Sequence, residues 1–539
     1  MDDPGPLDDP GRRIPVVVWA VTALHVALML CFSLLYPPFT GFDEVAHVDA
    51  VLAIRHGHGW PAPTERELSE GVVATSNPVL LAATRLPFSD DPLAARADRP
   101  SIASLGVNRD STTQPLPNQI TQHPPLYYAA GAAVLLAIPG SADWPFDRTV
   151  AALRLLSILF MAPLPLLAWA TARALRASAP VATAAAALPL SVPQLARVGG
   201  SVNNDALYAL AFATALLLLV RVAMGDLQRR TVLLTGAAVG LALLTKGFAL
   251  VLPLAVVACF VVAGRRGRDA GWWRAGALCL AVAFVVGGWW WLRNLVLYGA
   301  VQPAGWSQEA YRAKILGPPR APGTSAPLDD FISGLYARLS VRFWGGLGIN
   351  YTGPATYPRW VTDLLVGCVV AAVLVALVRF PRSRAAVGAA LLLPLAATLG
   401  LIAVGAYSSY QYSLAFPGTQ GRYLFGSLPG LSAVVALGLA AAFGRRRQLL
   451  PALVVLFALV MQAVGISAVL DRQWLPRGEG RSWTERYDVA VDGIVRWAPW
   501  PAPFTQLLML SALTGAVVVL VLVVRVALAA RTSTAPVAG

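Results

Sequence analysis

Apolar residues in this chain gather in long runs that are separated by short polar or basic segments. A helix that crosses a membrane needs about 20 mainly apolar residues. Runs of this kind begin near residues 14, 150, 180, 204, 231, 247, 272, 362, 385, 424, 450 and 505. The first run, residues 14–36, is longer than the core of a signal peptide, so we expect it to be retained. The pattern predicts an all-α polytopic membrane protein with about 12 transmembrane helices, in a range of about 11 to 13.

Two apolar segments do not have the length of a single membrane helix. Residues 126–138 amount to about two thirds of a span and end at Pro139 and Gly140, so we expect a juxtamembrane helix along the outer surface. Residues 231–263 would form one helix roughly 50 Å long, which exceeds the thickness of the hydrocarbon layer. We therefore divide this segment into two helices at Lys246.

The arginines between the apolar runs set the predicted orientation. Short cytoplasmic loops of membrane proteins carry an excess of Lys and Arg. With twelve spans, one side of the membrane receives all of the basic clusters, which are Arg12/Arg13, Arg173/Arg176, Arg229/Arg230, Arg265/Arg266/Arg268, Arg379/Arg382/Arg384, Arg445/Arg446/Arg447 and Arg531. We expect a multi-pass protein of the cytoplasmic (inner) membrane with both termini in the cytoplasm.

The long polar segments then fall on the outer, periplasmic side, at residues 37–149, 197–204, 293–361, 406–423 and 470–504. Irregular backbone has to lie in water or be covered by protein, so we expect an active site on the outer face. We divide the chain into a transmembrane module at 1–292 that includes the first outer loop 37–149, a large outer loop at 293–361, and a C-terminal transmembrane module at 362–539.

The overall composition excludes several classes of protein. Of the 539 residues, 57% are hydrophobic and 13% are charged, whereas a soluble domain has about 25% charged residues. The net charge of +14 comes from short clusters between apolar runs, which indicates topology signals and not a nucleic-acid-binding face. The four cysteines show no CxxC spacing, and the sequence has no Walker A, HExxH or GxSxG motif. Redox, zinc and nucleotide-driven chemistry are therefore unsupported.

Two acidic residues follow the first apolar run directly. Asp43 and Glu44 lie at the expected membrane exit, and on a helix His47 would share a face with Asp43. A carboxylate in this position can act as the general base for a sugar hydroxyl. The alternative is a solvated helix start, because acids favour the first turn of a helix.

Further polar groups stand at the start of other outer segments. His123 precedes two prolines and the juxtamembrane run, and is either a substrate ligand or a loop residue in water. Asn204 and Asp205 begin an apolar run from the outer side, where they serve as substrate ligands or as helix caps. The sequence leaves open whether a divalent cation binds, with Asp43, Asp205 and His123 as its candidate ligands.

Three cations lie at the expected outer ends of helices. Lys246 stands between two apolar runs, where an ionisable residue indicates function. Arg293 follows three tryptophans, and Arg422 is flanked by Gln420 and Tyr423. Each cation could simply extend to lipid headgroups. Together they predict a site for a lipid phosphate, which needs cations at headgroup depth.

These motifs, in this order, resemble those of the GT-C-fold membrane glycosyltransferases, in particular the protein mannosyltransferase-like and lipid A aminoarabinose transferase-like superfamily. The resemblance covers most of residues 14–445 and extends to a bacterial branch of this group. The matching segments are Phe42-Asp43-Glu44, His123-Pro124-Pro125-Leu126-Tyr127-Tyr128, Asn203-Asn204-Asp205, Leu244-Thr245-Lys246-Gly247, Phe343-Trp344-Gly345-Gly346-Leu347-Gly348 and Gln420-Gly421-Arg422-Tyr423-Leu424. His123 departs from the aminoarabinose branch, which looks to have an acidic residue there.

The resemblance implies an inverting glycosyltransferase that moves a hexosyl or pentosyl group from a polyprenyl-phosphate donor to a cell-envelope glycan, lipid or protein. In our hypothesis, Asp43 deprotonates the acceptor and Glu44 orients Asp43 or the acceptor. Lys246, Arg293 and Arg422 hold the departing lipid phosphate, together with Tyr423. By analogy with GC-rich actinobacteria, the sugar would be arabinofuranose or mannose.

The remaining polar residues are predicted to contact the substrates. They are His47, His123, Asn204, Asp205 and Gln420. A different class remains open, a polyprenyl-linked glycan flippase or transporter, for which charges at the bilayer midplane and inverted repeats are expected. The charges of this chain cluster at the outer boundary instead, which favours an enzyme.

Overall fold

The computed structural model describes residues 13–532 except 64, 92, 113–116, 268–269, 304–315, 350–355 and 478–481, and side chains as far as residue 528. The described residues are all-α, as predicted, and β-structure among them is confined to three isolated bridges in the first outer segment. Arg12, Arg268 and the side chain of Arg531 lie outside this description.

The chain forms twenty described helices, whose order and bounds are as follows. They are α1 (Val16–Leu35), α2 (Glu44–Arg55), α3 (Glu70–Thr84), α4 (Leu126–Ala137), α5 (Phe146–Met161), α6 (Leu164–Ala174), α7 (Ala179–Ala187), α8 (Pro193–Gly199), α9 (Asp205–Ala223), α10 (Arg229–Leu243), α11 (Leu252–Arg266), α12 (Trp272–Ala283), α13 (Trp289–Tyr298), α15 (Leu328–Trp344), α16 (Arg359–Arg379), α17 (Arg382–Ser413), α18 (Leu428–Phe443), α19 (Leu450–Gln473), α20 (Trp483–Trp497) and α21 (Ala502–Thr532). Between the helices the chain also forms short 3-10 turns, among them η2 (Phe88–Asp90), η7 (Leu188–Ser191), η8 (Gly247–Val251), η12 (Gly421–Ser427) and η13 (Gly444–Leu449).

Each of the twelve predicted runs coincides with a helix or with consecutive helices. In the described part of the chain, nine helical stretches are long and apolar enough to cross a membrane, and the bent pair α7/α8 makes a tenth. The other two predicted runs are α10, which has 15 residues, and the second half of the stretch Gly421–Gln473, which holds both α18 and α19. α18 and α19 both pack against the short helix α7, so the chain reverses its direction between them at η13. The protein is therefore a multi-pass membrane protein.

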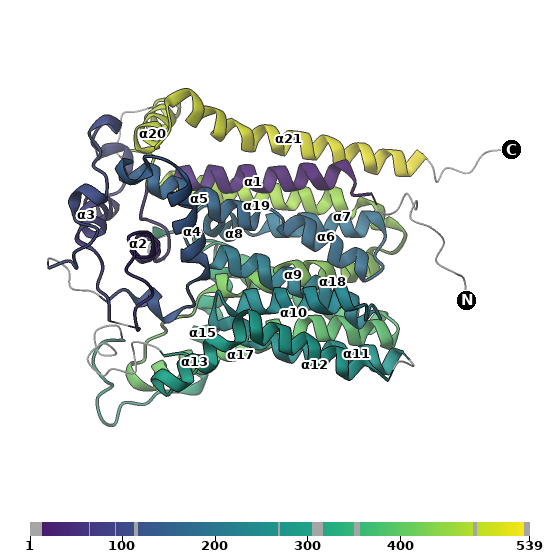
Figure 1. Ribbon diagram of the computed structural model, residues 1–539. Helices are drawn as coiled ribbons and strands as arrows, with labels where there is room; N and C mark the ends of the chain where they lie inside the picture. The colour runs from purple at the N-terminus through teal and green to yellow at the C-terminus, as the bar shows by residue number, and fades with distance from the viewer. Residues whose placement is uncertain are drawn as a thin grey trace.

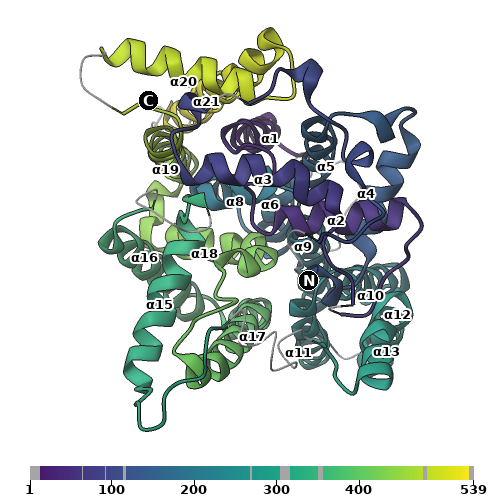
Figure 2. The ribbon, with the colours of Figure 1, turned by 90° about the vertical axis from the view of Figure 1, so that its left-hand side faces the viewer.

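The bundle has two different ends. α2, α3 and α4 gather at one end, while α1 begins and α21 ends at the other (Figure 1). The connections from α6 to α7 and from α11 to α12 also lie at the second end, and the last turns of α6 and α11, which precede them, carry Arg173 and Arg265. Seen from the first end, α2 and α3 lie across the ends of the bundle helices (Figure 2). This end is the one predicted to face outward.

The predicted divisions of the apolar runs are found in the structure. α10 ends at Leu243 and η8 begins at Gly247, so the chain breaks on either side of Lys246 as predicted. α4 has 12 residues and is too short to cross a membrane. The predicted domain boundary at residue 293 falls inside α13, which continues the stretch Trp272–Tyr298.

The outer segments are tied to one another by buried arginines. Arg99 pairs with Asp147 at the start of α5, and its Nη2 donates to the Arg496 carbonyl at 2.5 Å near the end of α20. Arg96 donates to the carbonyls of Val495 and Ala498. The first outer loop and the segment around α20 thus form one body on the bundle end, although about 400 residues separate them in the chain.

Candidate active site

Asp43 lies where the chain leaves the membrane and turns into α2. Its backbone is left-handed, with a φ of 55°, and it precedes the first helical residue. The side chain is 37% exposed. Its Oδ1 accepts a hydrogen bond from Gln119 Nε2 at 3.0 Å, and its Oδ2 accepts one from Arg422 Nη2 at 2.7 Å. Asp43 is therefore both accessible and already held by two partners.

The adjacent Glu44 points into the protein and is completely buried. Arg154 donates to both of its carboxylate oxygens, at 2.8 and 2.6 Å. The backbone amides of Gly41 and Val202 donate to the same carboxylate. Four donor groups thus surround Glu44 in a buried ion pair, and its predicted role of orienting Asp43 or the acceptor stays a prediction. It can orient Asp43 only through the backbone that they share.

Asp205 and Lys246 form a second buried ion pair. Asp205 begins α9 and Lys246 directly precedes η8, and Lys246 Nζ donates to Asp205 Oδ1 at 2.5 Å. The ammonium also lies 3.3 Å from Asn204 Oδ1 and 4.7 Å from the centre of the Tyr423 ring. Both charged side chains are at most 4% exposed. A buried charge is tolerated only with partners of this kind.

Arg422 joins the two carboxylates. Besides its hydrogen bond to Asp43, its Nε lies 3.3 Å from Asp205 Oδ2. The guanidinium is 5% exposed and lies over the ring of Phe42, with 4.9 Å to the ring centre. η12, which carries Arg422, thereby brings residues from four distant parts of the sequence into one cluster of two cations and two carboxylates. We call Asp43, Asp205, Lys246 and Arg422 the charged cluster.

Two histidines border the charged cluster. His47 Nδ1 lies 3.0 Å from the hydroxyl of Tyr128, and burial together with the Arg422 cation holds the pKa of His47 well below its ordinary value. Burial and the Lys246 cation lower the pKa of His123 to about 3. Both imidazoles are therefore neutral at pH 7, and neutral imidazoles can accept as well as donate hydrogen bonds.

Some polar atoms at the site have no partner in the described part of the protein. They are Nδ1 of His123, Oε1 of Gln420 and, apart from its ionic contact with Arg422, Oδ2 of Asp205. Buried polar atoms in folded proteins are almost always hydrogen-bonded to protein, water or ligand. These atoms are thus available to a ligand that carries hydroxyl groups.

Arg293 has no contact with the charged cluster among the described residues. Its described contacts are all on its own helix α13, where it donates to Asn294 Oδ1 and lies over the rings of Trp290 and Tyr298. Lys246 and Arg422 thus lie together in the charged cluster, and the predicted phosphate-binding role of Arg293 stays a prediction. Tyr423 stays beside the cluster, with its ring packed on Phe248.

The candidate metal ligands do not form a metal site in the described residues. No group of three His, Cys, Asp or Glu side chains that could hold an ion is found among them. The guanidinium of Arg422 stands between Asp43 and Asp205 and contacts both. The arrangement therefore does not fit a cation between these carboxylates.

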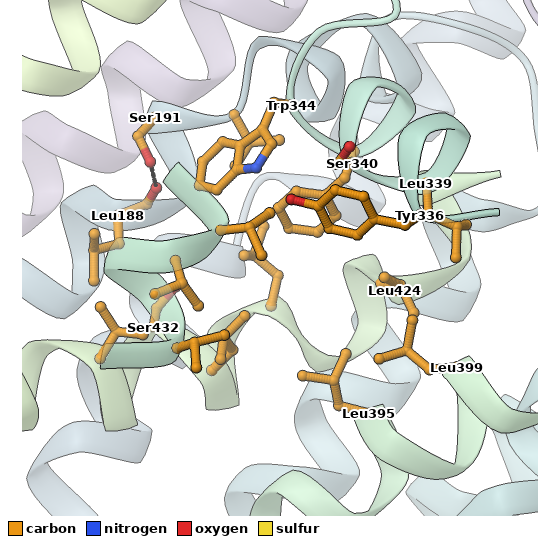
Figure 3. A pocket seen from close by; sticks show the side chains of 18 residues that line it. Leu188, Ser191, Tyr336, Leu339, Ser340, Trp344, Leu395, Leu399, Leu424 and Ser432 are labelled. Carbon is orange, nitrogen blue, oxygen red and sulfur yellow. Dashed lines mark hydrogen bonds between the residues drawn. The ribbon is translucent and has the colours of Figure 1, made fainter. Parts of the chain in front are cut away.

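An apolar cavity of about 280 Å³ adjoins η12. Leu424 and Leu428 contribute to its wall from this turn and the following helix. Trp344, Leu424 and Ser432 surround the space in Figure 3. The full lining is Leu188, Ser191, Val192, Tyr336, Leu339, Ser340, Phe343, Trp344, Val366, Val369, Val370, Leu395, Leu399, Leu424, Leu428, Leu431, Ser432 and Val435. Arg422 of the charged cluster and Leu424 of the cavity wall are thus only two residues apart in the sequence.

Three residues of the site were not predicted from the sequence. Arg154 lies inside the stretch Phe146–Ala174, and a charge within an apolar span was a signal that could have identified it. Arg197 on α8 is buried over the ring of Phe42 and donates to the carbonyls of Gly346 and Gly348. Gln119 begins the short 3-10 turn η5 (Gln119–Gln122), and no pattern in the sequence marks it.

Comparisons with known proteins give one family and several similar structures. A family model described as Predicted membrane protein (DUF2142) matches residues 26–431. Among solved structures, the chain is similar to ArnT from Cupriavidus metallidurans bound to undecaprenyl phosphate, with 15% identity, a TM-score of 0.42, and coverage of 95% of this chain and 77% of that chain. It is also similar to the oligosaccharyltransferase AglB from Archaeoglobus fulgidus in complex with an inhibitory peptide and a dolichol-phosphate. That similarity has 14% identity, a TM-score of 0.43, and coverage of 92% of this chain and 56% of that chain. No curated protein matches the sequence.

Proposed function

The chain belongs to the DUF2142 family of predicted membrane proteins, and we propose that it is a GT-C-type glycosyltransferase. It would move a sugar from a polyprenyl-phosphate donor to a cell-envelope acceptor on the outer face of the cytoplasmic membrane. The single observation that supports this most strongly is the position of η12, which carries Arg422 of the charged cluster and, two residues later, Leu424 of the apolar cavity.

A lipid-linked phosphate needs both of these surfaces at once. Arg422 and Lys246 offer charged donors to phosphate oxygens, and hydrogen bonds of this kind are among the strongest in proteins. The cavity, which begins two residues further on at Leu424, offers apolar lining for the first isoprene units. A soluble phosphate compound would have no use for the cavity, and a neutral lipid would have no use for the cations.

The acceptor side of the reaction falls to Asp43. It is the most exposed member of the charged cluster, at 37%, whereas the other three are at most 5% exposed. In the proposed step, an acceptor oxygen forms a bond with the anomeric carbon as the bond from that carbon to the phosphate oxygen breaks. Asp43 takes the acceptor proton, and the electron pair of the broken bond leaves with the lipid phosphate. Proton abstraction by such a base contributes typically about 10²- to 10⁴-fold in rate.

The unpartnered polar atoms fit the sugar. Nδ1 of His123 and Oε1 of Gln420 are buried, and in the described part of the chain they have no hydrogen-bond partner. Sugar hydroxyls can both donate and accept, so one sugar ring can satisfy both atoms. These residues would therefore select the donor sugar, while Lys246 and Arg422 recognise its carrier.

The orientation follows from the arginines at the opposite end of the bundle. α6 and α11, whose last turns carry Arg173 and Arg265, end away from α2, α3 and α4 (Figure 1). By the positive-inside rule that end faces the cytoplasm. The charged cluster would then face the outer side, where lipid-linked sugars meet cell-envelope acceptors.

The decisive experiment is transfer of radiolabelled sugar by the full-length protein in nanodiscs from a panel of polyprenyl-phosphate sugars. We expect transfer by the wild type, none by Asp43→Asn, and wild-type rates from Asp91→Asn. Asp91 is a suitable control because it is an outer-loop carboxylate that pairs with the exposed Arg85. Transfer by Asp43→Asn at the wild-type rate would refute the base. Movement of intact donor across the bilayer of proteoliposomes, without transfer, would establish a flippase instead.

A further inference from the structure

In this structure, the proposed base and the proposed phosphate-binding cation are bound to each other. Arg422 Nη2 donates to Asp43 Oδ2 at 2.7 Å, and Arg422 Nε lies 3.3 Å from Asp205 Oδ2. Oδ1 of Asp43 accepts from Gln119. Both oxygens of the base and two nitrogens of the cation are therefore engaged with protein partners.

The formal charges of the four side chains in the charged cluster cancel one another. Lys246 and Arg422 carry two positive charges, and Asp43 and Asp205 carry two negative charges. A donor phosphate adds at least one negative charge to this neutral set. A phosphate brought beside Arg422 repels the two carboxylates that already lie there and competes with them for the guanidinium. We therefore expect the more weakly held carboxylate to give way.

The exposures indicate which carboxylate leaves. Asp205 is 1% exposed and also holds Lys246, so losing its partners would strand a buried charge. Asp43 is 37% exposed and stands before the first residue of α2, so its side chain can turn towards water without disturbing the helix. Displacement of Asp43 is thus the exchange that the site permits most easily.

We propose that Arg422 couples donor binding to the release of the base. While the site is empty, Arg422 holds Asp43. When the donor phosphate binds, it takes the place of the Asp43 carboxylate on Arg422, and Asp43 becomes free to receive the acceptor hydroxyl. Donor binding then precedes productive acceptor binding. This inference rests on the proposed function, because it assigns a regulatory role within the same site.

The test is the affinity of undecaprenyl phosphate for the full-length protein in detergent, which needs no turnover. Asp43→Asn removes the competitor of the phosphate, so we expect it to bind the lipid about 2- to 10-fold more tightly, the range given by an exposed or half-exposed ion pair. Asp226→Asn is the matched control, since Asp226 pairs with Arg221 at the far end of α9. Its affinity should equal that of the wild type.

Equal or weaker binding by a folded Asp43→Asn protein overturns the coupling. A second measurement uses the wild type alone and does not depend on the folding of a variant. Carbodiimide-driven labelling of the Asp43 carboxylate, located by peptide mass spectrometry, should rise when undecaprenyl phosphate is added. Unchanged or lower labelling overturns the coupling as well.

The outcomes separate the coupling from the function on which it rests. If the wild type does not bind undecaprenyl phosphate, both the coupling and the proposed donor class fail. If it binds the lipid and Asp43→Asn binds it more tightly, but no donor in the panel gives transfer, the exchange at Arg422 stands and the transferase fails. If transfer occurs and Asp43→Asn binds no more tightly, only the coupling fails.

Discussion

Arg154 on α5 holds Glu44 with two hydrogen bonds, from Nε to Oε1 at 2.8 Å and from Nη2 to Oε2 at 2.6 Å. The same guanidinium donates to the carbonyls of Ser33, Tyr36 and Pro37 at the end of α1. One side chain thus joins the exit of the first span to the start of α2. Asp43, the neighbour of Glu44, owes its position beside Arg422 to this junction.

Arg154→Gln should therefore lower stability strongly. Removing one partner of a buried ion pair leaves an uncompensated charge and costs about 3–5 kcal/mol. Arg221→Gln, which breaks the half-exposed pair with Asp226, should cost less than about 1 kcal/mol. Unfolding of both variants in mixed micelles, followed by tryptophan fluorescence, gives the comparison. Equal losses of stability in the two variants would mean that the ion pair of Arg154 and Glu44 does not stabilise the fold.

Lys246→Met should weaken binding of undecaprenyl phosphate by about 10- to 100-fold, because a hydrogen bond to a charged group contributes about 1.5–3 kcal/mol. Arg293→Gln should bind it like the wild type, since the described contacts of Arg293 stay on α13. Titration of the lipid into both purified variants measures the difference. A loss of binding with Arg293→Gln would support the predicted phosphate-binding role of that arginine.

Hydropathy predicted the helices because the membrane requires long apolar runs. It also marked which polar residues lie at outer helix ends, including Asp43, Asp205, Lys246 and Arg422. It could not predict how they pair, since Asp43 and Arg422 are 379 residues apart and no local period relates them. Asp43 and Glu44 show the same limit. Both are acidic residues and they are adjacent in the chain, so the sequence does not distinguish them. In the structure, Asp43 has a left-handed backbone and an exposed carboxylate, whereas the Glu44 carboxylate is buried.

The two neutral histidines should make the protein less stable below pH 6.5. In the unfolded chain, histidine takes up a proton at a pKa of about 6.5. In the folded protein, burial lowers the pKa of His123 to about 3 and holds that of His47 well below its ordinary value. Stability is therefore complete above pH 6.5. It falls as the pH drops towards 3, because only the unfolded chain binds these protons.

Proton uptake by His123 in the unfolded chain should lower the stability by about 2 kcal/mol between pH 6.5 and pH 5. Thermal unfolding of wild type and His123→Asn at pH 7.5 and pH 5.0 tests this, and the variant should show the smaller decrease in Tm. His58→Asn is the control, because His58 is exposed and bonded to Asn108 in the outer loop. An equal decrease in Tm for wild type and His123→Asn would show that His123 is protonated in the folded protein.

The apolar cavity predicts how the protein binds the isoprenoid chain of the donor, and not how it binds the phosphate. Ser432 is buried in its wall among leucines and valines (Figure 3), and Ser432→Phe should fill part of the space that we assign to isoprene units. Each CH₂ excluded from the cavity costs about 0.8 kcal/mol, so losing a few of them should weaken undecaprenyl phosphate by about 30-fold. Inorganic phosphate, which has no isoprene unit, should bind as before, because Lys246 and Arg422 are untouched. Val378→Phe, on the exposed face of α16, is the control for added bulk. If Ser432→Phe weakened both phosphates alike, the change would have reached the charged cluster, and if it weakened neither, the isoprenoid chain would lie elsewhere.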